Sequence, residues 1–415
     1  MMLPKSPINF GFLLIILFTL SACKPNDELT LTPIATQIPI IPTATQNQIT
    51  CIDARQPTPL PDEKSLFPKI DLMNEHIRGN SDASVTLLVY SDYQCVSCAS
   101  LAQKLTYLQN KYPDEILVVF RNFPLESIHD KASIAARASE SAALQNKFWE
   151  MHDFLFFTQK EWEPLVPAAF QKWIIVQSAT IGLDAAKFEE DINSENITSI
   201  VENAWTSGQR IKLPGAPVIL INGEIIKWQI DLFQQLENYV KLAILSKKQF
   251  TTCPPFIVDP AKSYTARMKT TRGEIIIKLF KDKAPKTVNN FVFLAKAGWF
   301  TNNPFFIVVP GYIVETGDPS GTGFGGPGYF FATEKTSGIY DRAGLVGMLN
   351  AGVDTNGSQF FITLSPMPKY NKRYPLFGEV TQGLEILSNL HPQDPSISAN
   401  AAQIDGIISI TIEEK

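Results

Sequence analysis

The stretch VTLLVYSDYQCVSC, which spans residues 85–98, decides the fold of the N-terminal half of this chain. Residues 85–90 are apolar and rich in β-branched side chains, which predicts a buried β-strand. A polar turn follows, and leucines then recur at helical spacing over residues 99–108. The two cysteines, Cys95 and Cys98, therefore stand where a strand passes into the N-terminus of a helix.

A cysteine at a helix N-terminus is well placed for thiol chemistry. Backbone N–H groups without partners and the positive end of the helix dipole lower the pKa of a thiol there. A thiolate at Cys95 can attack disulfides, and Cys98, one turn later, can resolve the mixed disulfide. Two other interpretations remain open. One is half of a zinc site, for which the sequence has no second ligand pair, and the other is an inert structural disulfide.

Further motifs follow the cysteine pair. A second strand is expected at residues 116–120, and an alanine-rich helical stretch comes after it. Together with residues 91–98, the motifs at residues 121–125 (RNFPL), 148–153 (FWEMHD), 215–217 (GAP) and 221–223 (ING), with His129, resemble the DsbA-like thioredoxin family. The resemblance implies an α/β thioredoxin fold with a helical insertion over about residues 67–250.

The resemblance also implies the roles of individual residues. Cys95 would be the attacking thiol and Cys98 the resolving thiol. Pro217 would be a cis-proline that faces them. A cis X–Pro bond is uncommon, and here it would let the Ala216 backbone pair with a peptide substrate.

Two features depart from the family pattern. Val89 stands where many relatives have a buried glutamate, which would accept the proton of Cys98. Val96-Ser97 separates the cysteines, where strong oxidants of the family have Pro-His. We therefore expect a less oxidising cysteine pair than in those oxidants. His129 and His152 are expected to cap or pack helices rather than to bind a ligand.

Length and charge limit the remaining classes of function. The chain has 415 residues, and one core rarely exceeds about 250–300 residues, so we expect at least two domains. A hydrophobic content of 45% argues against both a wholly disordered chain and a polytopic membrane protein. With 36 basic and 41 acidic residues, the net charge of −5 gives no electrostatic reason to bind nucleic acid. We expect no nucleic-acid partner, no metal and no cofactor.

The N-terminus is typical of a secretory signal. Lys5 precedes an apolar run over residues 10–20, which is shorter than the ~20 apolar residues of a transmembrane helix. The sequence Leu20-Ser21-Ala22-Cys23 resembles the bacterial lipobox. This resemblance implies that residues 1–22 are a removed signal peptide and that Cys23 is lipidated, so we expect an extracytoplasmic protein anchored to the cell membrane. An ordinary signal peptide with a chance cysteine is the alternative.

Residues 23–66 are rich in proline and threonine and have no helical or strand period, which predicts an extended tether. An extracytoplasmic compartment is oxidising enough for disulfides. If Cys23 is lipidated and the Cys-x-x-Cys pair is redox-active, Cys51 and Cys253 remain, one on each side of the first folded unit. We predict a disulfide between them that staples the tether to the linker at residues 251–262. Two unrelated thiols are the alternative.

Residues 263–415 are expected to form a second folded unit. Strands are expected at residues 264–268 and 274–278, and a helix at residues 288–297. Short strands then alternate with glycine-rich loops, which favours a barrel. The motif Gly321-x-Gly323-x-x-Gly326 matches a dinucleotide-binding fingerprint in its letters. It follows a Gly-Asp-Pro turn and leads into a proline, whereas that fingerprint must follow a strand and open a helix, so we reject it.

The second unit resembles the cyclophilins over nearly its whole length. The motifs lie at residues 284–291 (APKTVNNF), 309–314 (VPGYIV), 317–323 (GDPSGTG), 348–352 (MLNAG), 355–362 (TNGSQFFI) and 377–380 (FGEV). The resemblance implies an eight-stranded antiparallel barrel with two helices and peptidyl-prolyl cis-trans isomerase activity.

The implied reaction needs no nucleophile, because amide resonance alone makes rotation about an X–Pro bond slow. An apolar pocket holds the proline ring. In this chain its walls are expected to be Tyr312, Ile313, Phe361 and Leu376, while Gln359 and the Asn350 backbone orient the peptide.

Several pocket positions depart from the cyclophilin pattern. Ile307 stands where an arginine donates a hydrogen bond to the twisted amide, and Glu315 replaces a glutamine. Lys369 and Tyr374 stand where a tryptophan and a histidine are usual. Removing one preorganised donor costs ~2.7–4 kcal/mol, so we expect a domain that binds proline peptides but isomerises them poorly. Two alternatives remain: Lys369 or Arg373 acts as a substitute donor, or the barrel serves only binding or structure.

These features predict a lipid-anchored extracytoplasmic folding factor. Its expected partners are unfolded or folding secreted proteins that contain cysteines and prolines, together with a membrane redox partner. One alternative is a non-catalytic lipoprotein that holds such clients. Another is a disulfide reductase fed by a membrane partner, which would keep its cysteines mostly as thiols.

Overall fold

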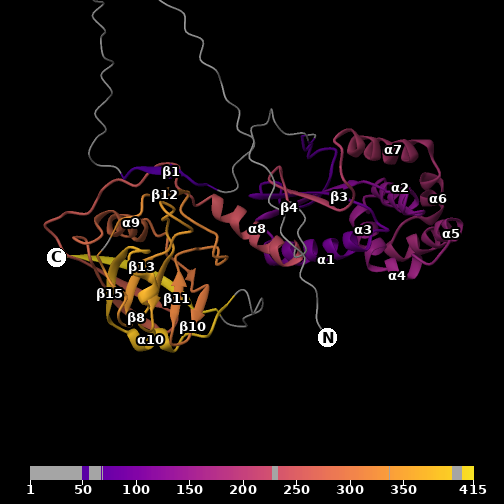
Figure 1. The fold of residues 1–415 in the computed structure, drawn as a ribbon. Helices are drawn as coiled ribbons and strands as arrows, with labels where there is room; N and C mark the ends of the chain where they lie inside the picture. Colours follow the sequence, from indigo (N-terminus) through magenta and orange to yellow (C-terminus); the bar gives the residue numbers. More distant parts are fainter. Residues whose placement is uncertain (1–48, 56–66, 68, 227–231, 336, 395–403) are drawn as a thin grey trace, which may run out of the picture. The chain divides into compact units, whose positions relative to one another are not determined.

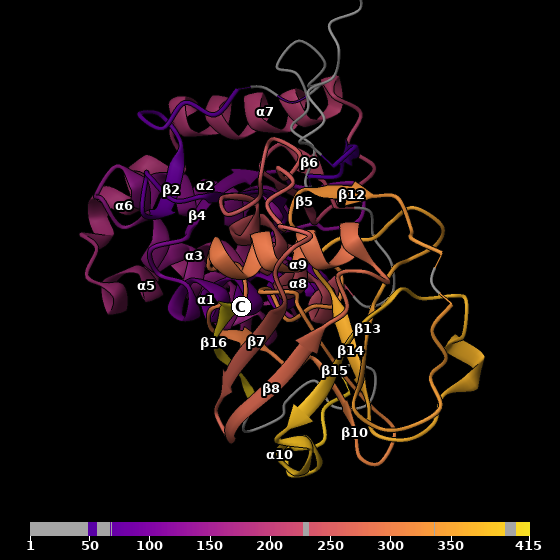
Figure 2. The ribbon, with the colours of Figure 1, turned by 90° about the vertical axis from the view of Figure 1, so that its left-hand side faces the viewer.

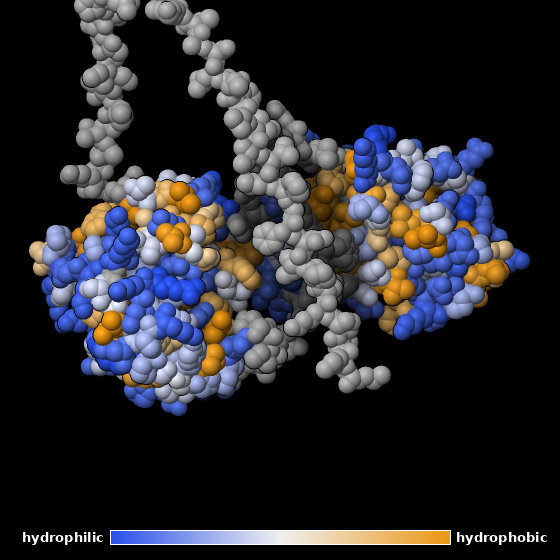
Figure 3. Space-filling view, in the orientation of Figure 1, coloured by the Kyte–Doolittle hydropathy of each residue, from blue (hydrophilic) through white to orange (hydrophobic). Residues whose placement is uncertain are grey.

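The computed structural model describes residues 49–55, 67, 69–226, 232–335, 337–394 and 404–415 (Figure 1). The expected signal peptide, Cys23 and most of the expected tether lie outside the described residues. Within the described ranges, no helix combines the length and the apolar character needed to cross a membrane. On the face shown in Figure 3, hydrophobic residues form small groups among hydrophilic ones, as is normal for a surface in contact with water.

The N-terminal half of the described chain is built on a five-stranded sheet in the order β2-β4-β3-β5-β6. The strands are β2 (His76–Gly79), β3 (Val85–Ser91), β4 (Ile116–Asn122), β5 (Val218–Ile221) and β6 (Glu224–Ile225). β3 runs parallel to β4 and antiparallel to β5. Because β3 is central and covered on both faces, every residue in it except Thr86 is buried, which explains its continuous apolar sequence.

One face of this sheet is covered by α1 (Val96–Lys111) and α8 (Leu232–Ser246), which lie on the same side of it in Figure 1. Leu101, Leu105 and Leu108 of α1 share a core with Leu236, Val240 and Ala243 of α8 and with the apolar side chains of β3. The leucines that predict the helix are therefore its buried face. Their spacing reflects packing against the sheet.

A helical insertion separates β4 from β5. It consists of α2 (Ala132–Ala143), α3 (Phe148–Phe157), α4 (Gln159–Trp162), α5 (Pro167–Ser178), η2 (Ala179–Ile181), α6 (Ala185–Ile192) and α7 (Glu195–Arg210). The insertion has its own apolar core, in which the rings of Trp162 and Phe170 stack 4.5 Å apart. Cys95 and Cys98 belong to the same core, so the insertion forms one wall around the cysteine pair.

The C-terminal half is a curled sheet with strand order β10-β11-β14-β13-β15-β8-β7-β16-β9. In chain order the strands are β7 (Tyr264–Thr270), β8 (Gly273–Leu279), β9 (Asn303–Pro304), β10 (Ile307–Val309), β11 (Ile313–Thr316), β13 (Leu345–Met348), β14 (Phe360–Thr363), β15 (Leu376–Gln382) and β16 (Gly406–Glu414). Helix α9 (Pro285–Lys296) and the short helix α10 (Leu384–Ser388) lie at opposite ends of it (Figures 1 and 2), and η3 (Pro368–Tyr370) lies in a later loop.

The two ends of this strand order come from one stretch of chain. β9 and β10 are separated only by Phe305 and Phe306, yet β9 pairs with β16 and β10 pairs with β11. The sheet therefore curls until residues 303–309 join its edges. The described residues contain nine strands in this sheet, against the eight expected from the sequence. The two counts agree only if β9 and β10 are taken as one bent strand, so the expected count stays a prediction.

The expectation that residues 23–66 form a tether is wrong for residues 49–55. β1 (Cys51–Asp53) pairs antiparallel with β12 (Tyr329–Phe331), and Ile49 is buried against Tyr329 and Phe331. Cys51 is joined by a disulfide to Cys253. The segment is therefore held to the C-terminal half by backbone pairing, apolar burial and a covalent bond. Its partner strand lies far along the chain, which is why local patterning does not reveal the strand.

Candidate functional site

Cys95 caps the N-terminus of α1. Its backbone is extended (φ −76°, ψ 122°), and its sulfur accepts a hydrogen bond from the Cys98 N–H at 3.3 Å. The Ser97 hydroxyl lies 3.4 Å from the same sulfur. Hydrogen bonding by the Cys98 thiol, supported by Ser97 and by the Cys98 N–H, lowers the pKa of Cys95 to about 6. Most of this thiol is therefore ionised at neutral pH, as a nucleophilic cysteine requires.

Cys98 has the opposite character. Both cysteines are free thiols that belong to the core shared with the insertion, with Cys95 7% exposed and Cys98 1% exposed. Burial raises the pKa of Cys98 well above its ordinary range, and the neighbouring Cys95 sulfur raises it further. Only Cys95 is thus suited to make the first attack, and Cys98 lies within reach to make the second.

We predict that the reduced protein reacts with iodoacetamide at Cys95 and not at Cys98. At pH 6.5 a thiol with a pKa near 6 is mostly ionised, whereas a thiol with the ordinary pKa of 9.0 is almost wholly protonated. Cys95 should therefore react about 10²-fold faster than an ordinary cysteine thiol. Mass spectrometry of quenched samples from pH 5 to 9 gives the two rates. Ser97→Ala should move the Cys95 profile towards higher pH, and equal rates for both cysteines would contradict the assignment.

The Ala216–Pro217 peptide bond is cis and lies beside the cysteine pair. The thiol of Cys95 contacts the carbonyl oxygen of Ala216 at 3.6 Å. A pocket lined by Ser97 and residues 214–218 opens at this point. The structure therefore brings together Cys95, Cys98 and Pro217, next to a recess that an extended peptide can enter.

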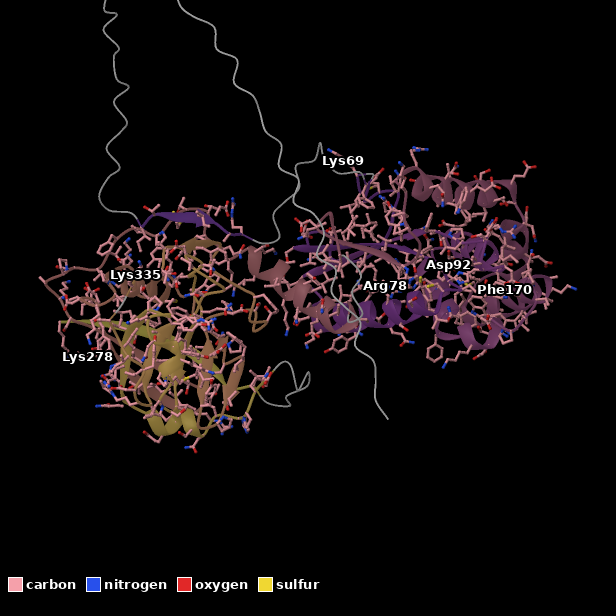
Figure 4. The ribbon with its side chains drawn as sticks, viewed as in Figure 1. Lys69, Arg78, Asp92, Phe170, Lys278 and Lys335 are labelled. Atoms are coloured by element: carbon pink, nitrogen blue, oxygen red, sulfur yellow. A yellow bond between two sulfur atoms is a disulfide. The ribbon has the colours of Figure 1, made fainter. Side chains whose placement is uncertain are left out.

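Asp92, labelled in Figure 4, holds the turn that precedes Cys95. Its buried carboxylate accepts hydrogen bonds from the backbone N–H groups of Gln94 and Leu125, both at 2.7 Å. The Nδ1 atom of His129 lies 2.9 Å from the same carboxylate. His129 thus fixes the loop after β4 against the turn that carries Cys95.

His152 packs within the insertion core. Its ring stands edge-on to the ring of Phe120, with 4.8 Å between centroids, and its Nδ1 atom lies 2.8 Å from Asp153. Burial lowers the pKa of His152, which favours the neutral ring. Both histidines therefore have structural contacts that account for their positions.

Gln159 is a site residue that sequence reasoning missed. Its side-chain amide donates to the carbonyl oxygen of Tyr93 at 2.7 Å and to that of Cys95 at 3.2 Å. The amide thus ties α4 of the insertion to the backbone that carries the attacking thiol. Gln159 follows Cys95 by 64 residues, so no local pattern announces the contact.

The residues expected to form a proline pocket line up across the C-terminal sheet. Ile307 on β10 is opposite Glu315 on β11, and Glu315 is opposite Phe361 on β14. The row continues through Gly347 on β13 to Leu376 on β15. Because residues in register on neighbouring strands point to the same face, these side chains lie on one side of the sheet.

The neighbouring row identifies that side. Val308, Val314, Ile362 and Val346 are also in register, and all of them belong to the main core of the C-terminal half. Side chains alternate between the two faces along a strand. The row that contains Ile307 therefore lies on the face away from this core.

A separate apolar cluster covers this outer face. It includes Ile307, Tyr312, Ile313, Phe361, Tyr374 and Leu376. The ring of Phe361 is fully buried, with the rings of Tyr370 and Tyr374 at 5.2 and 5.5 Å between centroids. Ile307 and Tyr312 are half-buried. Phe361 and Leu376 thus form a floor, and Ile307 and Tyr312 provide the accessible edge.

Comparison with known proteins identifies relatives of both halves of this chain. A family model described as cyclophilin type peptidyl-prolyl cis-trans isomerase/CLD matches residues 265–411. Peptidyl-prolyl cis-trans isomerase A of Mycobacterium tuberculosis is 44% identical over 144 residues, which cover 31% of this chain and 79% of that protein. The chain belongs to the cyclophilin family. A family model described as thioredoxin matches residues 71–241, so a thioredoxin-like domain precedes the cyclophilin domain.

Other relatives differ in how much of their length this chain matches. Peptidyl-prolyl cis-trans isomerase-like 1 of Gibberella zeae is 40% identical over 127 residues, which cover 30% of this chain and 78% of that protein. Peptidyl-prolyl cis-trans isomerase-like 2 of Rhizopus delemar is 31% identical over 291 residues, which cover 69% of this chain. The chain spans only 46% of the length of that relative. A solved cyclophilin-type isomerase of Cryptosporidium parvum is 35% identical, covers 36% of this chain and 98% of its own, and has a TM-score of 0.34.

Gln359 and Asn350 of the cyclophilin domain hold loops through their side chains. The amide of Gln359 donates to the carbonyl oxygens of Gly323 and Gly325, both at 2.9 Å. The amide of Asn350 donates to Asn356 at 3.2 Å. Gln359 therefore positions the glycine-rich loop beside the pocket, and the backbone of Asn350 stays the group expected to meet a peptide.

The glycine-rich loop itself wraps around a carboxylate. The buried Asp318 accepts hydrogen bonds from the backbone N–H groups of Thr322, Gly323 and Gly325, at 3.1, 2.8 and 3.0 Å. The N–H groups that would cradle a phosphate in a dinucleotide fold are occupied here. The loop leads to β12 rather than to a helix, which agrees with rejecting that fingerprint.

Glu315 is an unusual group on the outer face of the cyclophilin domain. Its half-buried carboxyl lies between Ile307 and Phe361 in the row described above. Burial raises the pKa of Glu315 to about 7. In the part of the chain that the structure describes, no three or more His, Cys, Asp or Glu side chains gather in a way that could hold a metal ion.

Proposed function

We propose that this protein is an extracytoplasmic folding factor, anchored to the cell membrane by lipid on Cys23, that joins thiol–disulfide exchange to proline recognition. The observation that carries the proposal is the thiol site, where a reduced low-pKa cysteine caps a helix beside a cis-proline. The DsbA-like motifs support the thiol chemistry, and the lipobox-like residues 20–23 support the anchor.

The proposed thiol chemistry runs through Cys95. In the oxidising direction, a client thiolate attacks the Cys95 sulfur of a Cys95–Cys98 disulfide, and Cys98 leaves as a thiolate that takes up a proton. A second client thiolate then attacks the client sulfur and releases Cys95. Two electrons have passed from the client to the cysteine pair. The low pKa of Cys95 makes it a good leaving group, and a membrane redox partner that accepts two electrons would regenerate the disulfide.

The cyclophilin domain would bind prolines of the same clients. Its relatives carry the name peptidyl-prolyl cis-trans isomerase, which supports an isomerase activity. Ile307 offers no hydrogen-bond donor on the accessible edge of the pocket, so we propose that the activity is weak. With both sites on one chain, the first module to bind raises the effective concentration of the second around the client.

The proposal is tested by mixing the purified full chain, with its Cys95–Cys98 pair oxidised, with a reduced unfolded protein that forms disulfides. We expect client disulfides to form about tenfold faster than in buffer, and one cysteine pair to become reduced for each disulfide formed. The same protein with Cys95 alkylated is the control. Thiol titration and mass spectrometry follow both partners.

Two outcomes would replace the proposal with another function. A chain that binds the client without accelerating disulfide formation is a client-holding lipoprotein. A chain whose reduced form reduces insulin readily, and whose cysteine pair is mostly dithiol in intact cells, is a reductase fed by a membrane partner.

A further inference from the structure

The carboxyl of Glu315 has no partner to balance its charge. In the described parts of the chain, its side chain forms neither a hydrogen bond nor an ion pair. Its strand neighbours in register, Ile307 and Phe361, are both apolar. An ionised carboxylate that loses part of its hydration without gaining a partner is destabilised. A ligand that brings a positive charge to this point would remove that penalty.

The nearby cations of the domain are engaged elsewhere. Lys369 on η3 places its ammonium 5.1 Å from the ring centre of Tyr312 and 5.5 Å from that of Tyr370. Arg373 lies over the ring of Tyr374, at 5.2 Å. The other titratable side chains of this cluster are the phenols of Tyr312, Tyr340, Tyr370 and Tyr374, and a phenol carries no positive charge in either protonation state. Burial raises the pKa of Tyr370 to about 12. Among the residues that the structure describes, no group packed against Glu315 therefore supplies the missing charge.

The position of Glu315 suggests what the unpaired carboxylate can bind. It stands in the same row as Ile307, at the accessible edge of the apolar cluster that would hold a proline ring. A side chain next to the bound proline would thus come close to the carboxylate. Arginine and lysine have long stems that can lie along apolar surface while their charged ends reach a carboxylate.

We infer that Glu315 is a specificity-determining residue, which makes the cyclophilin domain prefer prolines that have lysine or arginine beside them. The inference rests on the proposed proline binding and adds the substrate class to it. The preference depends on pH. Above a pH of about 7 the carboxylate is present and the preference holds. Below that pH the carboxyl takes up a proton and the preference fades, while lysine itself stays charged throughout.

The test compares two fluorescent peptides that differ in one side chain, Ala-Lys-Pro-Ala and Ala-norleucine-Pro-Ala, and a second pair with the variable residue after the proline. Binding to the full chain is measured by anisotropy at low salt, at pH 8.5 and pH 5.5. At pH 8.5 we expect one lysine peptide to bind about tenfold more tightly than its norleucine partner. At pH 5.5 the ratio should fall below about 2.

Glu315→Gln keeps the shape of the side chain and should bring the ratio to about 1 at both pH values. Glu379→Gln removes the same charge from β15, where that carboxylate pairs with Arg342, and should leave the ratio unchanged. Equal binding of lysine and norleucine peptides by the native chain, or a preference that survives Glu315→Gln, overturns the inference and leaves proline binding intact. If no peptide binds at all, proline recognition fails as well.

Discussion

The substitution Ile307→Arg is expected to raise the isomerase kcat/KM of the full chain by about 10²–10³. Ile307 is half-buried at the edge of the outer cluster, opposite Glu315 and two strands away from Phe361. A guanidinium there can donate to the amide of a bound X–Pro bond as it twists. The Glu315 carboxylate beside it would hold the guanidinium in place, so the donor would be oriented before the substrate binds.

A protease-coupled assay with a proline tetrapeptide measures this effect. Ile307→Met changes the side chain without adding a donor and should leave the low native activity unchanged. Thermal unfolding of each variant separates a lost fold from lost chemistry. If the native chain already isomerises at the level of Ile307→Arg, another group supplies the donor. Lys369→Ala and Arg373→Ala then show which cation does so, and our interpretation of Ile307 is wrong.

Elements with strong local signals are predictable from this sequence. The apolar run of β3 and the leucines of α1 predict a strand and a helix, and both occur with ends shifted by a few residues. The cap position of Cys95 follows from that junction. This position depends only on the short polar turn between the strand and the helix. The sequence alone therefore supports a lowered pKa for Cys95.

Elements that depend on distant partners are not predictable in this way. β1 forms because β12 offers backbone groups to it and because Ile49 finds an apolar site on Tyr329 and Phe331. Nothing in residues 49–55 alone indicates either partner. Gln159 is similar, since its contact with the carbonyl oxygen of Cys95 arises from the packing of the insertion.

The pocket of the cyclophilin domain could be predicted from the sequence only in part. Family motifs place Ile307, Glu315, Phe361 and Leu376 at a site, but only the strand register puts them in one row on the outer face. The sequence shows that Glu315 replaces a glutamine. It does not show that the carboxyl lacks a partner, because that depends on where Lys369 and Arg373 direct their charges.

The substitution Cys95→Ser is expected to abolish disulfide exchange, an about tenfold fall to the rate of buffer alone. Cys98 cannot replace it, because its sulfur is buried and its pKa is raised. The matched variant Cys98→Ser should behave differently. It keeps the attacking thiol, so mixing it with a disulfide-containing client should accumulate a covalent complex through Cys95, visible on a non-reducing gel and released by dithiothreitol.

Both variants retain the Cys51–Cys253 disulfide and the whole cyclophilin domain, so proline-peptide binding should be unchanged in each and serves as the control for folding. An exchange rate that survives Cys95→Ser would mean that the reaction does not pass through this thiol. Loss of exchange without a trapped complex in Cys98→Ser would mean that clients do not reach the Cys95 sulfur. The pair of variants therefore separates a chemically competent thiol from one that clients actually use.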